Sequence, residues 1–151
     1  MANGFNKIFD YNYWANSKLA SSLKEQNIVD VNILRLFSHI VLSEQIWILR
    51  IEGADNLNKN FWQILTLEEC DIFVNENYEI FKNLLSKLDL SKYAAYENSK
   101  GNKYTNSVHD ILTHVSFHSA YHRGQIAKEV RKINKEPVLT DYIVFVRQNK
   151  S

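Results

Sequence analysis

The chain has very few of the residues that bend or cross-link a polypeptide. Its 151 residues include four glycines, one proline and one cysteine. So few turn-forming residues favour a small number of long helices over many short strands. A single cysteine excludes an internal disulfide and fits a reducing compartment. At this length we expect a single domain over residues 1–151 that is large enough to bury a core.

An excess of charge and a long apolar run are also missing. Lys and Arg number 18 against 17 Asp and Glu, and the basic group at Lys128, Arg131, Lys132 and Lys135 is typical of the solvated end of a helix. No apolar run approaches the ~20 residues that span a bilayer. The N-terminus, with Asp10, lacks the uncharged core of a signal peptide. We therefore expect a cytoplasmic protein that binds neither nucleic acid nor membrane.

Apolar residues recur at helical spacing in four segments. The predicted helices run from about Gly4 to Gln26, from Asp30 to Glu52, from Thr66 to Leu88 and from Ser107 to Asn134. Asp30 suits an N-cap, and the pairs Thr66 with Glu69 and Ser107 with Asp110 have capping-box spacing. These signals place the starts of the last three helices.

The segments between and after these helices are shorter. Gly53 is placed to end the second helix, and the Asn-rich stretch Ala54–Ile64 predicts a loop held by Phe61 and Trp62. Tyrosines flank a turn-like sequence between Lys92 and Thr105, which predicts a short hairpin or an ordered loop.

The tail Thr140–Gln148 is ambiguous, because its β-branched residues favour a strand whereas Thr140–Asp141 resembles a helix start. Taken together, the elements predict an all-α fold: an antiparallel four-helix bundle with a short hairpin or ordered loop before the fourth helix and a short C-terminal helix.

Three histidines follow one another at steps of four residues in the fourth predicted helix. His114, His118 and His122 therefore share one stripe, with about 40° between neighbours on a helical wheel. Two neutral imidazoles on one face can chelate a transition metal. The pairs His114/His118 and His118/His122 compete for that role, and His118 belongs to both.

His39 stands alone in the second predicted helix. It is either a core histidine with a satisfied hydrogen bond or a further ligand. Its helical neighbours Ser43, Trp47 and Arg50 share its broad face, and a stripe containing His, Ser and Arg is more easily explained by a pocket than by a packed core. Ligands from two facing helices of a bundle can converge on one ion.

Other polar residues lie close to these stripes. Asn12 and Asn16 interrupt the apolar stripe of the first helix, either as its exposed edge or as a polar pocket wall. Glu44 lies about 140° around the helix from the histidine of the same segment, so it is a weak ligand candidate. Cys70 is expected to act as a small apolar residue, and His109 to lie at the surface.

The segment His118–Gln125, HSAYHRGQ, resembles the H-x-x-x-H-R-G-Q signature of the DinB family, within the DinB/YfiT-like superfamily. Tyr13–Leu19 is similar to the first-helix pattern of that family, and Ser38–Trp47 to its second-helix histidine block. Thr140–Ile143 resembles its closing segment. The resemblance covers nearly the whole chain.

This resemblance implies a four-helix bundle with a three-histidine site for a divalent metal whose open positions are often filled by water. By position, the ligands are His39, His118 and His122. Zinc or nickel is the expected ion, with iron and manganese as further candidates. The expected pocket residues are His114, Asn16, Trp47, Arg50, Tyr121 and Gln125.

The resemblance also assigns the residues after the last ligand. Arg123 is expected to point away from the metal and to tie helices together by an ion pair, with Asp141 as its expected partner. Gly124 is expected to allow close approach of a neighbouring helix.

The function implied is that of a metal-dependent enzyme acting on a small molecule, either a transferase that uses a low-molecular-weight thiol or a hydrolase. Because no carboxylate stands at clear general-base spacing, thiol transfer is preferred. The alternative is a non-catalytic metal-binding or sensing bundle. An aromatic content of 13% with three tryptophans also fits a homodimeric interaction module.

Overall fold

The computed structural model describes residues 3–54, 56 and 59–148 of the chain. Its elements are α1 (Asn3–Glu25), α2 (Val31–Glu52), α3 (Leu67–Lys87), β1 (Tyr93–Glu97), β2 (Lys103–Ser107), α4 (Val108–Lys132) and α5 (Tyr142–Gln148). The fold is mostly helical but not strictly all-α, because the predicted hairpin pairs as a two-stranded antiparallel sheet. Among the described residues, no helix combines the length and the apolar character needed to cross a membrane.

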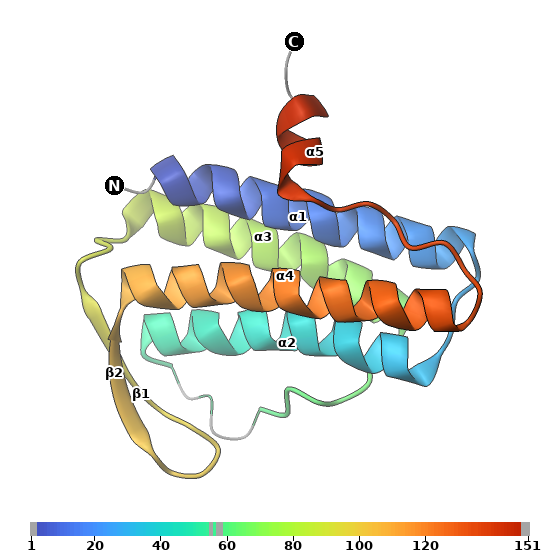
Figure 1. Ribbon diagram of the computed structural model, residues 1–151. Coiled ribbons are helices and arrows are strands. Elements are labelled where there is room, and N and C mark those ends of the chain that lie inside the picture. Colours follow the sequence, from blue (N-terminus) through green and yellow to red (C-terminus); the bar gives the residue numbers. More distant parts are fainter. Residues whose placement is uncertain (1–2, 55, 57–58, 149–151) are drawn as a thin grey trace.

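Four long helices lie side by side, with α5 standing off beyond α1 (Figure 1). Both α1 and α2 contact α3 and α4. The hairpin lies where α2 ends and α4 begins, and it contacts both helices. One side of the pair formed by α2 and α4 is therefore flanked by a small sheet.

The ends of α2 are set by local chemistry. The Asp30 carboxylate accepts hydrogen bonds from the backbone N–H groups of Asn32 and Ile33, as expected of an N-cap. Gly53 ends the helix with a φ of 71°, a left-handed conformation that glycine adopts without steric cost. The predicted start and end of α2 are both confirmed.

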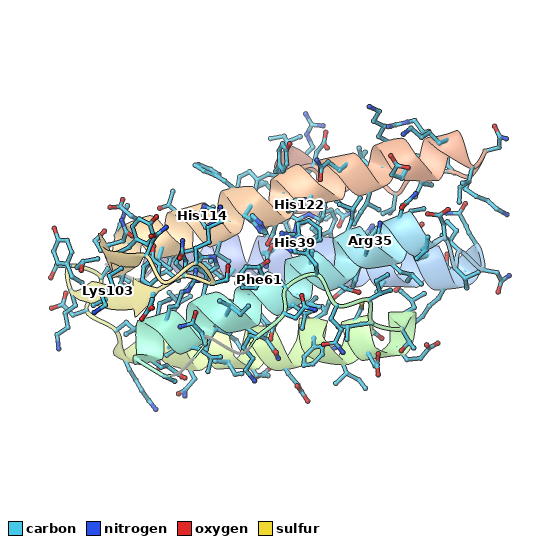
Figure 2. All side chains as sticks on the ribbon, turned by 90° about the horizontal axis from the view of Figure 1, so that it is seen from below. Arg35, His39, Phe61, Lys103, His114 and His122 are labelled. Carbon is cyan, nitrogen blue, oxygen red and sulfur yellow. The ribbon has the colours of Figure 1, made fainter. Side chains whose placement is uncertain are left out.

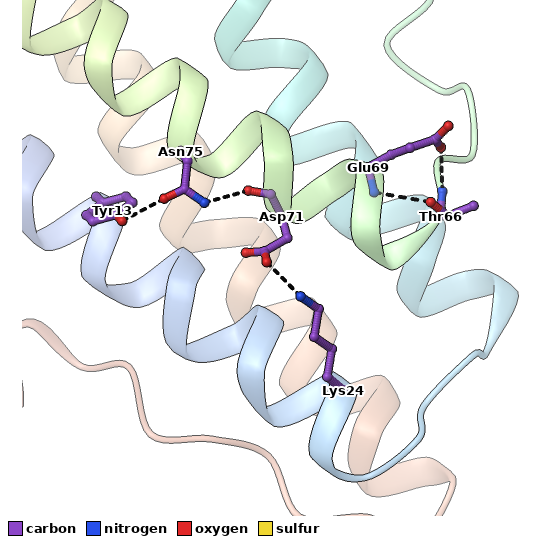
Figure 3. Close-up of polar contacts among 6 residues, drawn as sticks. All are labelled: Tyr13, Lys24, Thr66, Glu69, Asp71 and Asn75. Carbon is purple, nitrogen blue, oxygen red and sulfur yellow. Dashed lines mark hydrogen bonds and ion pairs between the residues drawn. The ribbon is translucent and has the colours of Figure 1, made fainter.

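The starts of α3 and α4 also follow the sequence signals. Thr66 Oγ1 accepts from the N–H of Glu69 while the Glu69 carboxylate accepts from the N–H of Thr66 (Figure 3). Ser107 Oγ accepts from the N–H of Asp110 and donates to its carboxylate. These bonds satisfy N–H groups that the first turn of a helix leaves without intrahelical partners.

The core is formed by apolar side chains from all four long helices. The largest of those that are fully buried are Phe37, Phe81, Leu23, Ile33, Ile40, Ile111, Leu112 and Ile126. Cys70 is also buried, and its burial raises the pKa of the thiol to about 11. Cys70 therefore acts as a small apolar residue, as the sequence predicts.

Polar contacts between α1 and α3 lie on the surface of this core (Figure 3). Lys24 Nζ lies 2.6 Å from an Asp71 carboxylate oxygen, and Tyr13 donates a 2.7 Å hydrogen bond to Asn75. Exposed ion pairs contribute only about 0–1 kcal/mol. The two helices are therefore held together mainly by their apolar faces.

The C-terminal segment forms a helix rather than a strand. Phe145 is buried, with its ring centroid 5.7 Å from that of Tyr11 and 5.6 Å from that of Trp14. Trp14 Nε1 also donates to Gln148 Oε1 at 3.1 Å. Local propensity leaves both a helix and a strand open for this segment. Its contact with α1 selects the helix.

The capping box of α3 yields a stability prediction. Replacing Thr66 by alanine removes the acceptor for the Glu69 N–H, so Thr66→Ala should lower the free energy of unfolding by about 1 kcal/mol. Urea unfolding followed by circular dichroism measures this difference. Thr66→Ser keeps the hydroxyl and should retain most of the stability, and equal losses in both variants would contradict the assigned role.

Candidate metal centre

Three histidines from α2 and α4 converge on one point. The candidate ligand atoms of His39, His118 and His122 all lie within 4.8 Å of one another. His118 Nε2 is 3.2 Å from His39 Nε2 and 3.1 Å from His122 Nε2. Figure 2 shows His39 and His122 on facing helices, with His114 farther along α4. The structure thus joins His118 to His122 rather than to His114 at this point.

Hydrogen bonds at the far side of two rings fix their orientation. His39 Nδ1–H donates to the carbonyl of Phe61 at 3.0 Å, and His122 Nδ1–H donates to Gln125 Oε1 at 2.7 Å. A proton on Nδ1 leaves Nε2 of a neutral imidazole with a free lone pair. Such outer hydrogen bonds are typical of metal-binding histidines, since they set both the tautomer and the ring direction.

His118 meets both of these rings through a single atom, its Nε2. His39 and His122 carry their protons on Nδ1. A proton shared between two of the Nε2 atoms can therefore come only from His118. Burial and the three neighbouring histidines lower the pKa of His118 to about 3, and burial also lowers the pKa of His39. Neutral imidazoles at His39 and His118 therefore offer nitrogen lone pairs at the point where the three rings meet.

The distances within the cluster fit a small transition-metal ion. Nitrogen ligands about 2.0–2.1 Å from zinc are separated from one another by roughly 2.9–3.4 Å in octahedral or tetrahedral geometry. The Nε2–Nε2 distances of 3.1 and 3.2 Å fall in this range. Within the described part of the chain, the group contains three histidines and no fourth side-chain ligand. Such a set leaves a coordination position for an external molecule.

An aromatic side chain covers part of the cluster. The Trp62 indole stacks face to face on His39, with ring centroids 3.8 Å apart and planes 4° apart. Its segment is fixed to α2 by the Phe61 carbonyl and by the Leu65 N–H, which donates to Ser38 Oγ at 2.8 Å. The sequence predicts that Phe61 and Trp62 hold this loop, but it gives no signal for the contact of Trp62 with His39.

Three residues predicted to line a pocket lie around the histidines in different ways. Gln125 accepts the Nδ1–H of His122 and so orients the His122 ring. Tyr121 is 65% exposed, with its ring centroid 5.2 Å from that of His122. His114 is exposed, and its ring lies 5.4 Å from His118.

Trp47 and Arg50 lie next to His114, toward the hairpin. The His114 and Trp47 ring centroids are 5.2 Å apart. The buried Arg50 guanidinium lies 4.5 Å from the Trp47 ring and 4.7 Å from the Tyr96 ring, within cation–π distance of both. Sequence periodicity identifies Trp47 and Arg50. Tyr96 comes from the hairpin, and only the tertiary fold shows that it lies beside them.

Asn16 belongs to a buried polar network rather than to the histidine cluster. Asn12 and Asn16 donate to the two carboxylate oxygens of Glu44 at 3.0 and 3.4 Å. Arg123 Nη1 donates to the side-chain oxygens of both asparagines at 2.8 Å. Both asparagines are buried, so the interpretation as the exposed edge of the stripe is wrong. The network connects α1, α2 and α4.

Two expectations for the residues after His122 require correction. Arg123 does tie helices together, but its partners are Asn12 and Asn16, and Asp141 is exposed with no ion pair to it among the described residues. Gly124 is exposed, and a Cβ placed there would have no atom of another part of the chain within 4 Å. A close helix contact therefore does not explain this glycine.

Glu44 is the acidic member of the network. Burial raises the pKa of its carboxyl to about 7, although the Arg123 charge and the hydrogen bond from Asn12 oppose this increase. A carboxyl whose pKa is higher in the folded than in the unfolded chain binds its proton more tightly when folded. Its contribution to stability is present below about pH 4.5 and is lost as the pH rises through 7.

The direction of this pKa shift gives a prediction for Glu44→Gln. Glutamine keeps the shape but has no proton to release, so the free energy of unfolding of the wild type should fall relative to the variant by about 3 kcal/mol between pH 4.5 and 8. Urea titrations of both proteins across this range, with chelator present, measure the difference. Glu76→Gln on the exposed face of α3 is the matched control. Parallel pH profiles for wild type and Glu44→Gln would contradict the assignment.

Comparison with known proteins extends the resemblance seen in the sequence. A family model described as the DinB family matches residues 1–150. Protein DinB of Bacillus subtilis (strain 168) is 28% identical over 165 aligned residues, which cover 96% of this chain and 95% of that protein. Uncharacterized protein YizA of the same organism is 27% identical over 149 residues, covering 91% of this chain and 92% of that protein. The match over nearly the full length shows that this chain belongs to the DinB family.

Proposed function

We propose that this protein binds a divalent transition-metal ion through His39, His118 and His122 and is a metal-dependent enzyme acting on a small molecule. The observation that carries the proposal is the convergence of three Nε2 atoms, two of them on rings whose Nδ1 atoms are already hydrogen-bonded. In this proposal the four long helices form an antiparallel bundle, and the ligands come from its facing helices α2 and α4.

The donor set narrows the choice of ion. Three neutral imidazoles suit zinc, nickel and iron, whereas manganese is better matched by oxygen ligands. We therefore favour zinc or nickel, with iron and then manganese behind them. The His39 and His122 rings are held by Phe61 and Gln125, so the ion would meet ligands that are already oriented.

The reaction proposed is transfer of a low-molecular-weight thiol, with hydrolysis as the second choice. A bound ion supplies Lewis acidity, which lowers the pKa of a thiol or a water molecule that it binds. The stacked Trp62 shields one face of His39 from water. Among the described residues the cluster includes no carboxylate, and Glu44 is engaged by Asn12 and Asn16. Thiol transfer needs less help from a general base than hydrolysis does, because a thiol ionises more readily than water.

A non-catalytic metal-binding or sensing protein is the alternative, in which the ion joins α2 to α4. Phe117 and Tyr121 lie one turn apart on α4 and are 72% and 65% exposed. Exposed aromatic side chains next to a site favour association with another molecule. We propose a homodimer for this form, which light scattering after size-exclusion chromatography would measure.

The metal proposal predicts the metal content of tag-free protein. The wild type should carry about one ion per chain, and His39→Ala, His118→Ala and His122→Ala should each lose most of it, because a two-histidine remnant binds far more weakly. Inductively coupled plasma mass spectrometry measures both the amount and the element. His109→Ala is the control on the same helix, since this histidine is exposed and outside the cluster.

His114→Ala separates the two overlapping histidine pairs. We expect it to keep the metal, because its ring lies beside His118 but outside the converging group. Equal metal content in the wild type and all three ligand variants would end the metal proposal. Loss of metal from His114→Ala but not from His122→Ala would show that the ligand pair is wrong.

Catalysis is tested with small thiols and electrophilic acceptors. We expect thiol consumption by metal-loaded wild type, loss of turnover on chelation, and its recovery on return of the ion found in the purified protein. His118→Ala, treated in the same way, is the control for reaction without the three-histidine site. Metal binding that raises the melting temperature with no turnover of any thiol or ester would favour the non-catalytic alternative.

A further inference from the structure

A second feature lies beside the histidine cluster, at the hairpin end of α4. A cavity of ≈ 310 Å³ is bounded by residues of α2, both strands of the hairpin and α4. Its lining residues are Trp47, Tyr96, Asn106, Asp110, Ile111 and His114. Figure 2 shows His114 on the side of His122 that faces the hairpin residue Lys103. Because His114 precedes the ligand His118 by one helical turn, the cavity adjoins the candidate metal centre.

Two aromatic rings form a corner in this cavity. The Trp47 and Tyr96 ring centroids lie 5.2 Å apart, with the ring planes at 80°. The buried Arg50 guanidinium contacts both rings, and its Nε donates to Asn56 Oδ1 at 2.9 Å, so the corner is held in place from behind. A flat group can stack on one ring while meeting the edge of the other, which are the preferred aromatic geometries.

A polar group at the same corner has a defined orientation. Tyr96 OH donates a 2.7 Å hydrogen bond across the hairpin to Asn106 Oδ1. This bond assigns the oxygen of the Asn106 amide, so the NH₂ is the end that can donate to a ligand. A carbonyl oxygen on a flat ligand is a matching acceptor.

Charges of opposite sign lie around the cavity, so an ionic ligand of either sign is repelled by one of them. The Asp110 carboxylate, which also accepts from Ser107, repels anions at the rim. The Arg50 guanidinium behind the two rings repels cations. The volume lies at the lower end of ligand pockets, which are about 300–1,000 Å³, and it suits one substituted ring.

We infer that this cavity binds an uncharged, planar, conjugated group carrying a carbonyl oxygen, with Trp47 and Tyr96 as its walls and Asn106 as its donor. That the group belongs to the substrate of the metal-dependent reaction rests on the proposed function. The binding itself depends only on residues outside the three ligands.

Benzamide is a minimal probe with these properties. Titration of the full-length protein, observed by protein NMR with and without chelator, should show saturable shifts for residues lining the cavity. Cyclohexanecarboxamide has the same amide but a puckered ring, and benzoate has the same ring but a negative charge. Both should bind at least about threefold more weakly, because the puckered ring loses stacking on an aromatic wall and the carboxylate is repelled by the Asp110 carboxylate in the cavity lining.

Two variants test the walls and the donor separately. Tyr96→Leu removes the ring, and Asn106→Asp keeps an acceptor for Tyr96 OH but removes the NH₂ donor. Each should weaken benzamide binding by about threefold to tenfold. Tyr93→Leu changes an exposed tyrosine of the same strand and should leave the affinity unchanged. Melting temperatures identify any variant that fails to fold, and Asn106→Asp, at an exposed position, keeps the test valid if Tyr96→Leu does not fold.

The outcomes separate this inference from the metal proposal. Absence of saturable benzamide binding, equal binding of cyclohexanecarboxamide, or equal weakening by Tyr93→Leu would overturn the cavity assignment whatever the metal content. If His118→Ala still binds benzamide and carries as much metal as the wild type, the cavity assignment is supported and the metal centre is rejected. Weaker benzamide binding by Tyr96→Leu and Asn106→Asp, with unchanged metal content, is the result expected if both proposals are right.

Discussion

The packing of α2 against α4 is the constraint on which the rest of the structure depends. His39 from α2 meets His118 and His122 from α4 at nitrogen separations of 3.1–3.2 Å between neighbours. A shift of either helix by one residue would move a Cα by about 1.5 Å along the axis and rotate its side chain by about 100°. The histidines could then no longer converge. The cavity beside them depends on the same packing, since its walls include Trp47 of α2 and His114 of α4.

The buried network gives this packing its specificity. Glu44, Asn12, Asn16 and Arg123 are almost entirely removed from water, and their hydrogen bonds are made only when α1, α2 and α4 are in one register. An unpaired buried polar group costs about 1–3 kcal/mol, and an unpaired charge costs more. Apolar side chains at these positions would allow several helix arrangements of similar energy, whereas the polar ones favour a single arrangement.

Much of the helical framework could be predicted from the sequence because its signals are local. Asp30, Gly53 and the Thr66–Glu69 pair act within a few residues of themselves, so their pattern in the chain is enough to place helix ends. The tail could not be assigned in this way, since its conformation depends on Phe145 meeting α1, more than a hundred residues away in the chain. The partners of Arg123 depend on the tertiary fold in the same way: the resemblance implies an ion pair with Asp141, whereas Asn12 and Asn16, which it contacts, lie more than a hundred residues away in the chain.

In the candidate site, too, the sequence predicts only the residues whose signals are local. Helical spacing brought His114, His118 and His122 to one stripe but left two pairs open, and only the resemblance to a known family selected His39 and His122. The structure brings those three together. Trp62, Tyr96 and Asn106 lie in a loop and a hairpin whose sequences carry no periodicity, so their approach to the histidines is a property of the tertiary fold alone.

The stack of Trp62 on His39 has an optical consequence. Because the indole lies in stacking contact with the imidazole, with ring centroids 3.8 Å apart, we expect its fluorescence to change when that imidazole becomes positively charged or binds a metal ion. Trp14 and Trp47 emit from other environments, beside Phe145 and Arg50. The protein therefore carries an intrinsic fluorophore whose emission reports the state of one histidine without any added label.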